Sequence, residues 1–210
     1  ILLSRALLEV APGSAIVGEV KCSQTLFDDI EAHGGSAILA RVGHSLIKAR
    51  MKEEGALLAG EMSGHIFFKH RYFGYDDAIY TTCRVLEVLS STSLPLSSLM
   101  SDVPVTHVTP EIRTDCSDHI KFDVVDDCIE WFRDALSGNK ATDDPPIDLI
   151  DIDGVRVIFD GGWGLVRASN TQPVLVLRCE AQTETRLKDI KALMDRVVAH
   201  AISSREYKNA

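Results

Sequence analysis

Hydrophobic positions in the first half of the chain follow two alternating spacings. Apolar residues recur at helical spacing in three stretches, 1–10, 24–33 and 44–54. Between these stretches, short continuous apolar runs typical of buried strands occupy 15–20, 36–41 and 56–59. Strands that alternate with helices in this way predict an α/β layer with parallel strand pairing.

A change in composition marks the end of this first region. An aromatic and basic segment, 67–75, leads to Asp76-Asp77, which we expect to cap a helix over 78–89 because acidic residues suit a helix start. A Ser/Thr-rich stretch and one more short helical piece, 96–100, come next. Such a stretch is typical of a linker, so we place a domain boundary near 103–105.

The second half of the chain contains several strands separated by short turns. A strand over 105–113, bent or at a sheet edge because of Pro110, is followed by a helix from 117 or 118 to 136. Further strands are predicted at 149–152, 155–159, 164–166 and 173–180, and a helix capped by Thr183 and running to about 202 closes the chain. The pattern predicts a small antiparallel α+β domain, so the expected domains are 1–104 and 105–210.

Composition and charge narrow the range of functions. The 210 residues carry a formal net charge of −9, which argues against nucleic acid or an anionic membrane as the main partner. No apolar run approaches ~18 residues, so no transmembrane helix is predicted. Five scattered cysteines without a C-x-x-C pair indicate reduced thiols and a cytoplasmic location. The sequence begins inside a helical pattern without Met, which we interpret as a portion of a longer protein.

The run GEMSGH, residues 60–65, concentrates polar chemistry. It places Glu61, Ser63 and His65 at alternating positions, and an extended backbone would send all three side chains to one side. A carboxylate can accept hydrogen bonds from two neighbouring sugar hydroxyls, and a histidine can meet a phosphate. A polar turn with capping residues also explains this composition, since Gly60 and Gly64 allow sharp turns.

Polar residues follow three of the predicted strands of the first half. They are Lys21, then His44, then the group Glu61, Ser63 and His65. Ligands of open α/β sheets bind beyond the carboxyl ends of the strands, which favours a binding site at this edge. A metal site built from the histidines and one cysteine lacks ligand spacing, so no metal site is predicted from His33, His44, His65, His70 and Cys22.

A second donor-rich segment, Arg167-Ala168-Ser169-Asn170-Thr171-Gln172-Pro173, stands in the other half. A guanidinium matches phosphate oxygens in pairs, and hydroxyl and backbone N–H groups can complete such a site. A hairpin turn with an exposed arginine is the alternative interpretation. Acidic residues nearby lack the convergent spacing of a cation site and are expected to be solvated: Asp143, Asp144, Asp148, Asp151 and Asp153.

These motifs carry a resemblance to a known family. GEMSGH followed by FFKHRYFGYDDAIY, with VGHSLIKARMKEEGALLAGE upstream and GWGLVRASNTQPVLVLR downstream, closely resembles the α-D-phosphohexomutases, nearest to the bacterial phosphomannomutase/phosphoglucomutase subgroup. The resemblance covers nearly the whole chain. It implies a four-domain enzyme that interconverts hexose 1- and 6-phosphates through a bisphosphorylated intermediate, of which this chain matches only the C-terminal half, domains 3 and 4.

The same resemblance implies a fold and a role for each half. Domain 3 would be a mixed α/β sheet domain for sugar recognition, and domain 4 a small antiparallel α+β domain similar to the TATA-box-binding protein. The implied contacts to sugar hydroxyls are Glu61 and Ser63, with Lys21, His44 and His65 as further contacts near the active centre. The implied phosphate-binding loop consists of Arg167, Ser169, Asn170 and Thr171. The glucosamine subgroup usually has Gln where Met62 stands, which favours glucose and mannose substrates.

The chain also departs from the family pattern. It has no Ser-His-Asn-Pro-like loop for the phosphoserine that donates the phosphoryl group, and no D-G-D-G-D-R-like loop for Mg²⁺. For the full enzyme the resemblance implies Mg²⁺, glucose 1,6-bisphosphate and the two missing N-terminal domains. We therefore expect this chain alone to bind hexose phosphates without catalysing their conversion. A natural non-catalytic module, derived from the family for sugar-phosphate binding or for interaction, is the alternative.

Overall fold

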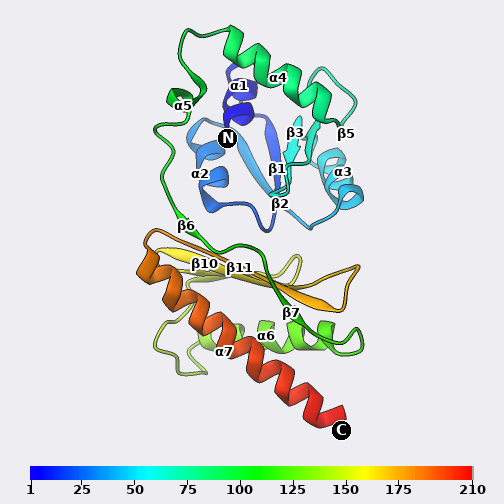
Figure 1. Cartoon of the computed structure of the whole chain (residues 1–210), viewed down its shortest axis with the longest axis vertical. Helices are drawn as coiled ribbons and strands as arrows, with labels where there is room; N and C mark the ends of the chain where they lie inside the picture. Colours follow the sequence, from blue (N-terminus) through cyan, green and yellow to red (C-terminus); the bar gives the residue numbers. More distant parts are fainter. Residues whose placement is uncertain (210) are drawn as a thin grey trace. The chain divides into compact units, whose positions relative to one another are not determined.

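The computed structural model describes residues 1–209, and the chain divides into two compact units, Ile1–Pro104 and Val105–Ala210 (Figure 1). Each unit has its own sheet and its own hydrophobic core. The first is an α/β unit with a mixed sheet and the second an α+β unit with an antiparallel sheet, so the predicted fold classes are confirmed. No helix in the described part of the chain combines the length and the apolar character needed to cross a membrane.

The sheet of the first unit has the strand order β2-β1-β3-β4-β5. Its parallel part comprises β1 (Ala15–Glu19) in the middle, β2 (Ser36–Ala40) and β3 (Leu58–Gly60). Two short strands extend the sheet beyond β3: β4 (Ile66–Phe68) runs antiparallel to β3, and β5 (Tyr75–Asp76) runs antiparallel to β4. The predicted parallel pairing therefore holds for the first three strands, and the chain reverses direction between β3 and β4.

Helices cover both faces of this first sheet. The helices of this unit are α1 (Leu2–Val10), α2 (Gln24–Ala32), α3 (His44–Glu53), α4 (Ala78–Ser90) and the short α5 (Leu96–Leu99), which buries none of its residues. Successive strand residues face opposite sides, so Val17 belongs to a core cluster with Ile47 of α3. Its neighbour Ile16 belongs to another cluster with Leu7 of α1 and Ile30 of α2. Helix α3 thus covers one face, and α1 and α2 cover the other.

The second unit has an antiparallel sheet with the strand order β6-β11-β10-β9-β8, and β7 also pairs with β11. The strands are β6 (His107–Val108), β7 (Ile112–Asp115), β8 (Asp148–Ile150), β9 (Val155–Phe159), β10 (Gly162–Ala168) and β11 (Val174–Ala181). The single strand predicted over 105–113 is wrong. It is split into β6 and β7 around Pro110, whose ring nitrogen cannot donate to a ladder.

Both helices of the second unit, α6 (Lys121–Leu136) and α7 (Glu184–Asn209), lie on one face of its sheet (Figure 1). Helix α7 continues past the predicted end near 202. In this last part of α7 the Arg205 side chain donates from Nε to Asp127 Oδ2 of α6 at 2.5 Å. This contact stabilises the longer helix, and no local sequence pattern reveals it. Helix α6 begins a few residues later than the predicted start at 117 or 118.

Candidate functional site

The end of β1 carries a buried acid that sequence reasoning missed. Glu19 is fully buried, and its carboxylate accepts hydrogen bonds from the backbone N–H groups of Lys21 (2.6 Å) and Met62 (3.1 Å). Burial raises the pKa of the Glu19 carboxyl, while the hydrogen bond and the charge of Lys21 act in the opposite direction. The carboxylate thus joins the segment of Lys21, itself buried, to the turn after β3. The sequence did offer one indication of this buried acid, because Glu19 is a charged residue inside the apolar run 15–20.

The GEMSGH run forms a tight turn, so the polar-turn interpretation of this run is correct and the extended arrangement of its side chains does not occur. β3 and β4 pair in antiparallel fashion with Gly60 opposite Ile66, and the chain must therefore reverse within 61–65. The Glu61 N–H donates to the His65 carbonyl at 2.9 Å, and Gly64 has a φ of +92° that favours glycine. The turn still brings Glu61 and His65 together, because they stand on either side of it.

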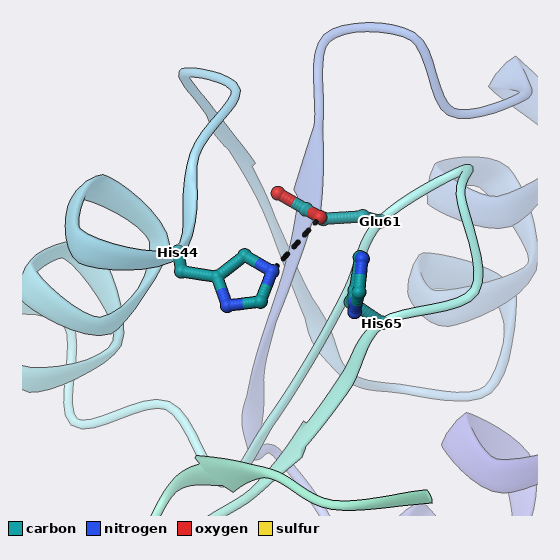
Figure 2. A group of neighbouring side chains, drawn as sticks. All are labelled: His44, Glu61 and His65. Atoms are coloured by element: carbon teal, nitrogen blue, oxygen red, sulfur yellow. Dashed lines mark ion pairs between the residues drawn. The ribbon is translucent and has the colours of Figure 1, made fainter.

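The Glu61 carboxylate is the centre of the first candidate site, although only 6 % of its side chain is exposed. Its Oε1 accepts from the Gly43 N–H at 3.3 Å, and its Oε2 accepts from the Ser63 hydroxyl at 3.2 Å. Gly43 has a φ of +132° and directly precedes α3, so the carboxylate faces the positive end of a helix dipole. His44, the first residue of α3, places Nε2 3.8 Å from Glu61 Oε2 (Figure 2).

His65 completes this cluster with the help of Asp76, a second residue that sequence reasoning missed. The imidazole rings of His44 and His65 lie edge to face with centroids 4.4 Å apart. His65 Nδ1 lies 2.7 Å from Asp76 Oδ2, and since a carboxylate only accepts, Nδ1 is the donor. We predicted that Asp76 and Asp77 together cap α4, but only Asp77 does, accepting from the Tyr80 N–H at 2.9 Å.

The second candidate site, in the other unit, is built around a buried arginine. Arg167 lies at the end of β10, where its Nε donates to Asp153 Oδ2 at 3.1 Å, and only 6 % and 8 % of the two side chains are exposed. The interpretation of an exposed arginine in a turn and that of a solvated Asp153 are therefore wrong. A Cβ at Gly154 would lie 2.2 Å from the Val166 carbonyl oxygen, so this glycine lets the β8–β9 turn approach β10.

The loop beyond Arg167 closes the β10–β11 hairpin. Ser169 is buried, and its hydroxyl accepts from the backbone N–H groups of Thr171 (3.4 Å) and Gln172 (3.2 Å). Asn170 and Thr171 are exposed at the tip. The hairpin interpretation of this segment is therefore correct for its backbone, and two of its N–H groups already have a partner within the loop.

Two further cations reach this loop, and neither was predicted. Lys121, which is buried, donates from Nζ to the Gln172 carbonyl at 3.0 Å and to Asp118 at 2.5 Å. Arg113 of β7 donates to the Gln172 side chain at 2.5 Å and pairs with Glu111. The Arg113 contact follows from β7 pairing with β11, a long-range contact without a local signal. Each of the cations at this loop, Arg167 included, is paired with a carboxylate.

Two protein-family models match the chain, and between them they cover both candidate sites. The model described as phosphoglucomutase/phosphomannomutase, alpha/beta/alpha domain III, matches residues 1–106. The model described as phosphoglucomutase/phosphomannomutase, C-terminal domain, matches residues 112–197. The chain belongs to the phosphoglucomutase/phosphomannomutase family. The family resemblance drawn from the sequence motifs is therefore confirmed.

Relatives in this family have similar sequences but longer chains. The phosphomannomutase/phosphoglucomutase of Pseudomonas putida is 48% identical over 190 residues, which cover 90% of this chain and 39% of the relative. The phosphoglucomutase of Neisseria meningitidis serogroup A is 41% identical over 191 residues, with the same coverage of 90% and 39%. A crystal structure of a family protein from Burkholderia thailandensis has a TM-score of 0.81 at 37% identity, covering 95% of this chain and 40% of its own. This chain spans about two fifths of the length of these relatives.

The two candidate sites belong to different domains of the family. The turn at 61–65 lies within the match to domain III, and the loop at 167–173 lies within the match to the C-terminal domain. Among the residues considered for a metal site, His44 and His65 come together with Glu61, whereas the others do not belong to this group. The substrate-contact roles remain predictions for Lys21, His44, Glu61, Ser63, His65, Arg167, Ser169, Asn170 and Thr171.

Proposed function

We propose that this chain carries the sugar-recognition and phosphate-binding parts of an enzyme that interconverts hexose 1-phosphate and hexose 6-phosphate through a bisphosphorylated intermediate. The observation that carries the proposal is the Glu61 carboxylate, which is oriented by two donors and lies beside two imidazoles. It stands in a chain that belongs to the phosphoglucomutase/phosphomannomutase family. We assign sugar recognition to residues 1–104 and phosphate binding to residues 105–210.

Glu61 supplies the grip on the sugar. Its two oxygens offer about four acceptor positions, of which Gly43 and Ser63 use two. The remaining positions accept from two neighbouring hydroxyls, which we take to be those at C3 and C4. Glucose and mannose have these hydroxyls in the same arrangement, so one carboxylate tolerates both sugars. The same pair is presented in a similar way when the bisphosphorylated intermediate turns over between the two transfers.

Arg167 supplies the clamp on the phosphate that is not reacting. Asp153 holds the Nε edge of its guanidinium and thereby fixes the plane in which the other N–H groups lie. Ser169, Asn170 and Thr171 supply hydroxyl, amide and backbone donors at the loop. Each nearby cation already has a carboxylate partner. Phosphate binding therefore replaces carboxylate contacts of these cations with phosphate contacts, instead of neutralising unpaired positive charge.

The full enzyme requires Mg²⁺ and a phosphoserine, and Asp151 and Asp153 of this chain do not fit the metal. A Mg²⁺ site needs oxygen ligands that converge in octahedral geometry. Asp153 is instead paired with Arg167, and Asp151 is paired with Arg133. We therefore propose that Mg²⁺, the phosphoserine and the N-terminal domains belong to parts of the enzyme outside these 210 residues. This chain alone then binds hexose phosphates without converting them.

Calorimetric titration of the 210-residue chain with glucose 1-phosphate, glucose 6-phosphate and mannose 6-phosphate tests this proposal. We expect weak binding of all three ligands with similar affinities, because the grip does not involve C2. The matched control is Glu53→Gln, which changes an exposed carboxylate of α3 on the same unit. Absence of binding by the unmodified chain would refute the proposal that these residues form a preassembled site.

A further inference from the structure

The cluster at the turn after β3 has the composition of a transition-metal site. His44, Glu61 and His65 each place one ligand atom within 4.8 Å of the other two (Figure 2). A tetrahedral Zn²⁺ with nitrogen ligands at about 2.0–2.1 Å sets its ligand atoms about 3.3 Å apart. The histidine side chains are 45 % and 46 % exposed, so they can rotate to close the remaining gap.

The charges around the cluster favour a cation. His44 Nε2 lies 3.8 Å from Glu61 Oε2 and 3.9 Å from Asp76 Oδ2. Two carboxylates thus surround two imidazoles that are neutral when they bind a metal. Two histidines and one glutamate form a ligand set that Zn²⁺ occupies in proteins with a fourth position left for water. Imidazole ligands also distinguish this cluster from a site for Mg²⁺, which prefers oxygen ligands.

The partners of the cluster orient it for metal binding. Because Asp76 accepts the proton of His65 Nδ1, the neutral ring presents its lone pair on Nε2. A histidine held by a carboxylate in this way is the usual arrangement behind a metal ligand. Glu61 is held in turn by the Gly43 N–H and the Ser63 hydroxyl. The supporting hydrogen bonds of a metal site are therefore already formed.

We propose that His44, Glu61 and His65 bind one divalent transition-metal ion, with Zn²⁺ as the best fit. The ion and a hexose phosphate exclude each other, because a metal bond to Glu61 takes one of the two acceptor positions that the pair of sugar hydroxyls needs. This exclusion rests on the proposed function, whereas metal binding itself does not. Zn²⁺ is then an inhibitor of sugar recognition at this turn.

Titration of the 210-residue chain with Zn²⁺, in the absence of any sugar, tests the metal site. We expect His44→Ala and His65→Ala each to weaken Zn²⁺ binding at least about 10-fold, and Asp76→Asn to weaken it about 10-fold through the loss of ligand orientation. His119→Ala removes an exposed imidazole of the other unit and should leave the affinity unchanged. Circular dichroism verifies that each variant is folded. Equal affinity in the unmodified chain and in both ligand variants would overturn the proposal.

Cobalt(II) distinguishes this site from binding to cysteine. Cys83 is the exposed thiol, and the other four are buried. We expect a Co²⁺ spectrum without a thiolate charge-transfer band in the near ultraviolet, and the same spectrum in Cys83→Ser. A strong charge-transfer band that disappears in Cys83→Ser would place the metal on the thiol and refute the histidine site.

Competition with glucose 6-phosphate tests the exclusion separately. As free Zn²⁺ is raised, the apparent Kd for glucose 6-phosphate should rise linearly with the free Zn²⁺ concentration, as competition for one site requires. Unchanged affinity at full Zn²⁺ occupancy would overturn the exclusion. If glucose 6-phosphate fails to bind even with a chelator present, the proposed function fails, while the histidine variants still decide whether the metal site exists.

Discussion

The two candidate sites differ in whether their central charged group already has an ionic partner. At the turn after β3, the Glu61 carboxylate is surrounded by neutral donors and by imidazoles that are about half exposed. At the β10–β11 loop, Arg167 is buried and already paired with Asp153. The first arrangement offers unused acceptor positions to a neutral polyol. The second must rearrange ion pairs to bind an anion. Phosphate affinity therefore depends on the difference between the energy of the Arg167–phosphate contact and that of the Arg167–Asp153 pair, whereas sugar affinity involves no such exchange.

The largest expected effect comes from breaking the Arg167–Asp153 pair. Arg167→Ala leaves a buried carboxylate without its main cation, so we expect a loss of about 3–5 kcal/mol in the free energy of unfolding, together with loss of most phosphate affinity. Urea unfolding and phosphate titration measure the two effects. The double variant Arg167→Ala, Asp153→Ala should recover much of the stability but none of the phosphate affinity. A single variant as stable as the unmodified chain would show that the pair is not structural.

Glu61→Gln should have the next largest effect, and only on sugar phosphates. Charge-assisted hydrogen bonds contribute about 1.5–3 kcal/mol, so we expect hexose phosphate affinity to fall about 10- to 100-fold while inorganic phosphate affinity is unchanged. Titration of both ligands, with Glu53→Gln as the control, measures this difference. Equal losses for the two ligands would contradict the sugar-grip role of Glu61.

The buried Glu19 should make the stability of the first unit depend on pH. Its folded-state pKa is raised by burial, so the folded state binds more protons than the unfolded state above the unfolded pKa of about 4.3. Its contribution to stability is therefore complete below that pH and is lost as pH rises through the folded pKa. Glu19→Gln should lack this part of the pH dependence in urea unfolding at several pH values from 4 to 7. Identical pH profiles would rule out a titrating Glu19.

The smallest effects come from a matched pair of serines. Ser63→Ala removes an exposed donor to Glu61, and Ser169→Ala removes a buried acceptor of two loop N–H groups. At about 0.5–1.5 kcal/mol per hydrogen bond, we expect losses of about 2- to 10-fold. Ser63→Ala should weaken hexose phosphates alone, and Ser169→Ala should also weaken inorganic phosphate. The reverse pattern, measured by the same titrations, would exchange the roles of the two sites.

The sequence was sufficient to predict the helices and most of the strands, because their apolar spacing is regular. It did not predict the short strands β4 and β5, and it merged β6 and β7 into one strand. It also identified the two segments that carry the polar chemistry. For GEMSGH the sequence allowed both an extended run and a polar turn, because an alternating polar pattern does not reveal that β4 folds back on β3. The roles of Asp76, expected to cap a helix, and of Asp153, expected to be solvated, were predicted wrongly for a related reason. Their contacts with His65 and Arg167 depend on strand pairing and on a turn packed against β10, which no local pattern encodes.

Backbone amide NMR of the 210-residue chain during titration with glucose 6-phosphate tests the central claim most directly. The account predicts shifts at two separate groups of amides, one at Gly43 and 61–65 and the other at 169–172. Inorganic phosphate should move only the second group. Shifts confined to other surfaces, or shifts of the amides at Gly43 and 61–65 with inorganic phosphate alone, would contradict the division of sugar and phosphate recognition between the two units.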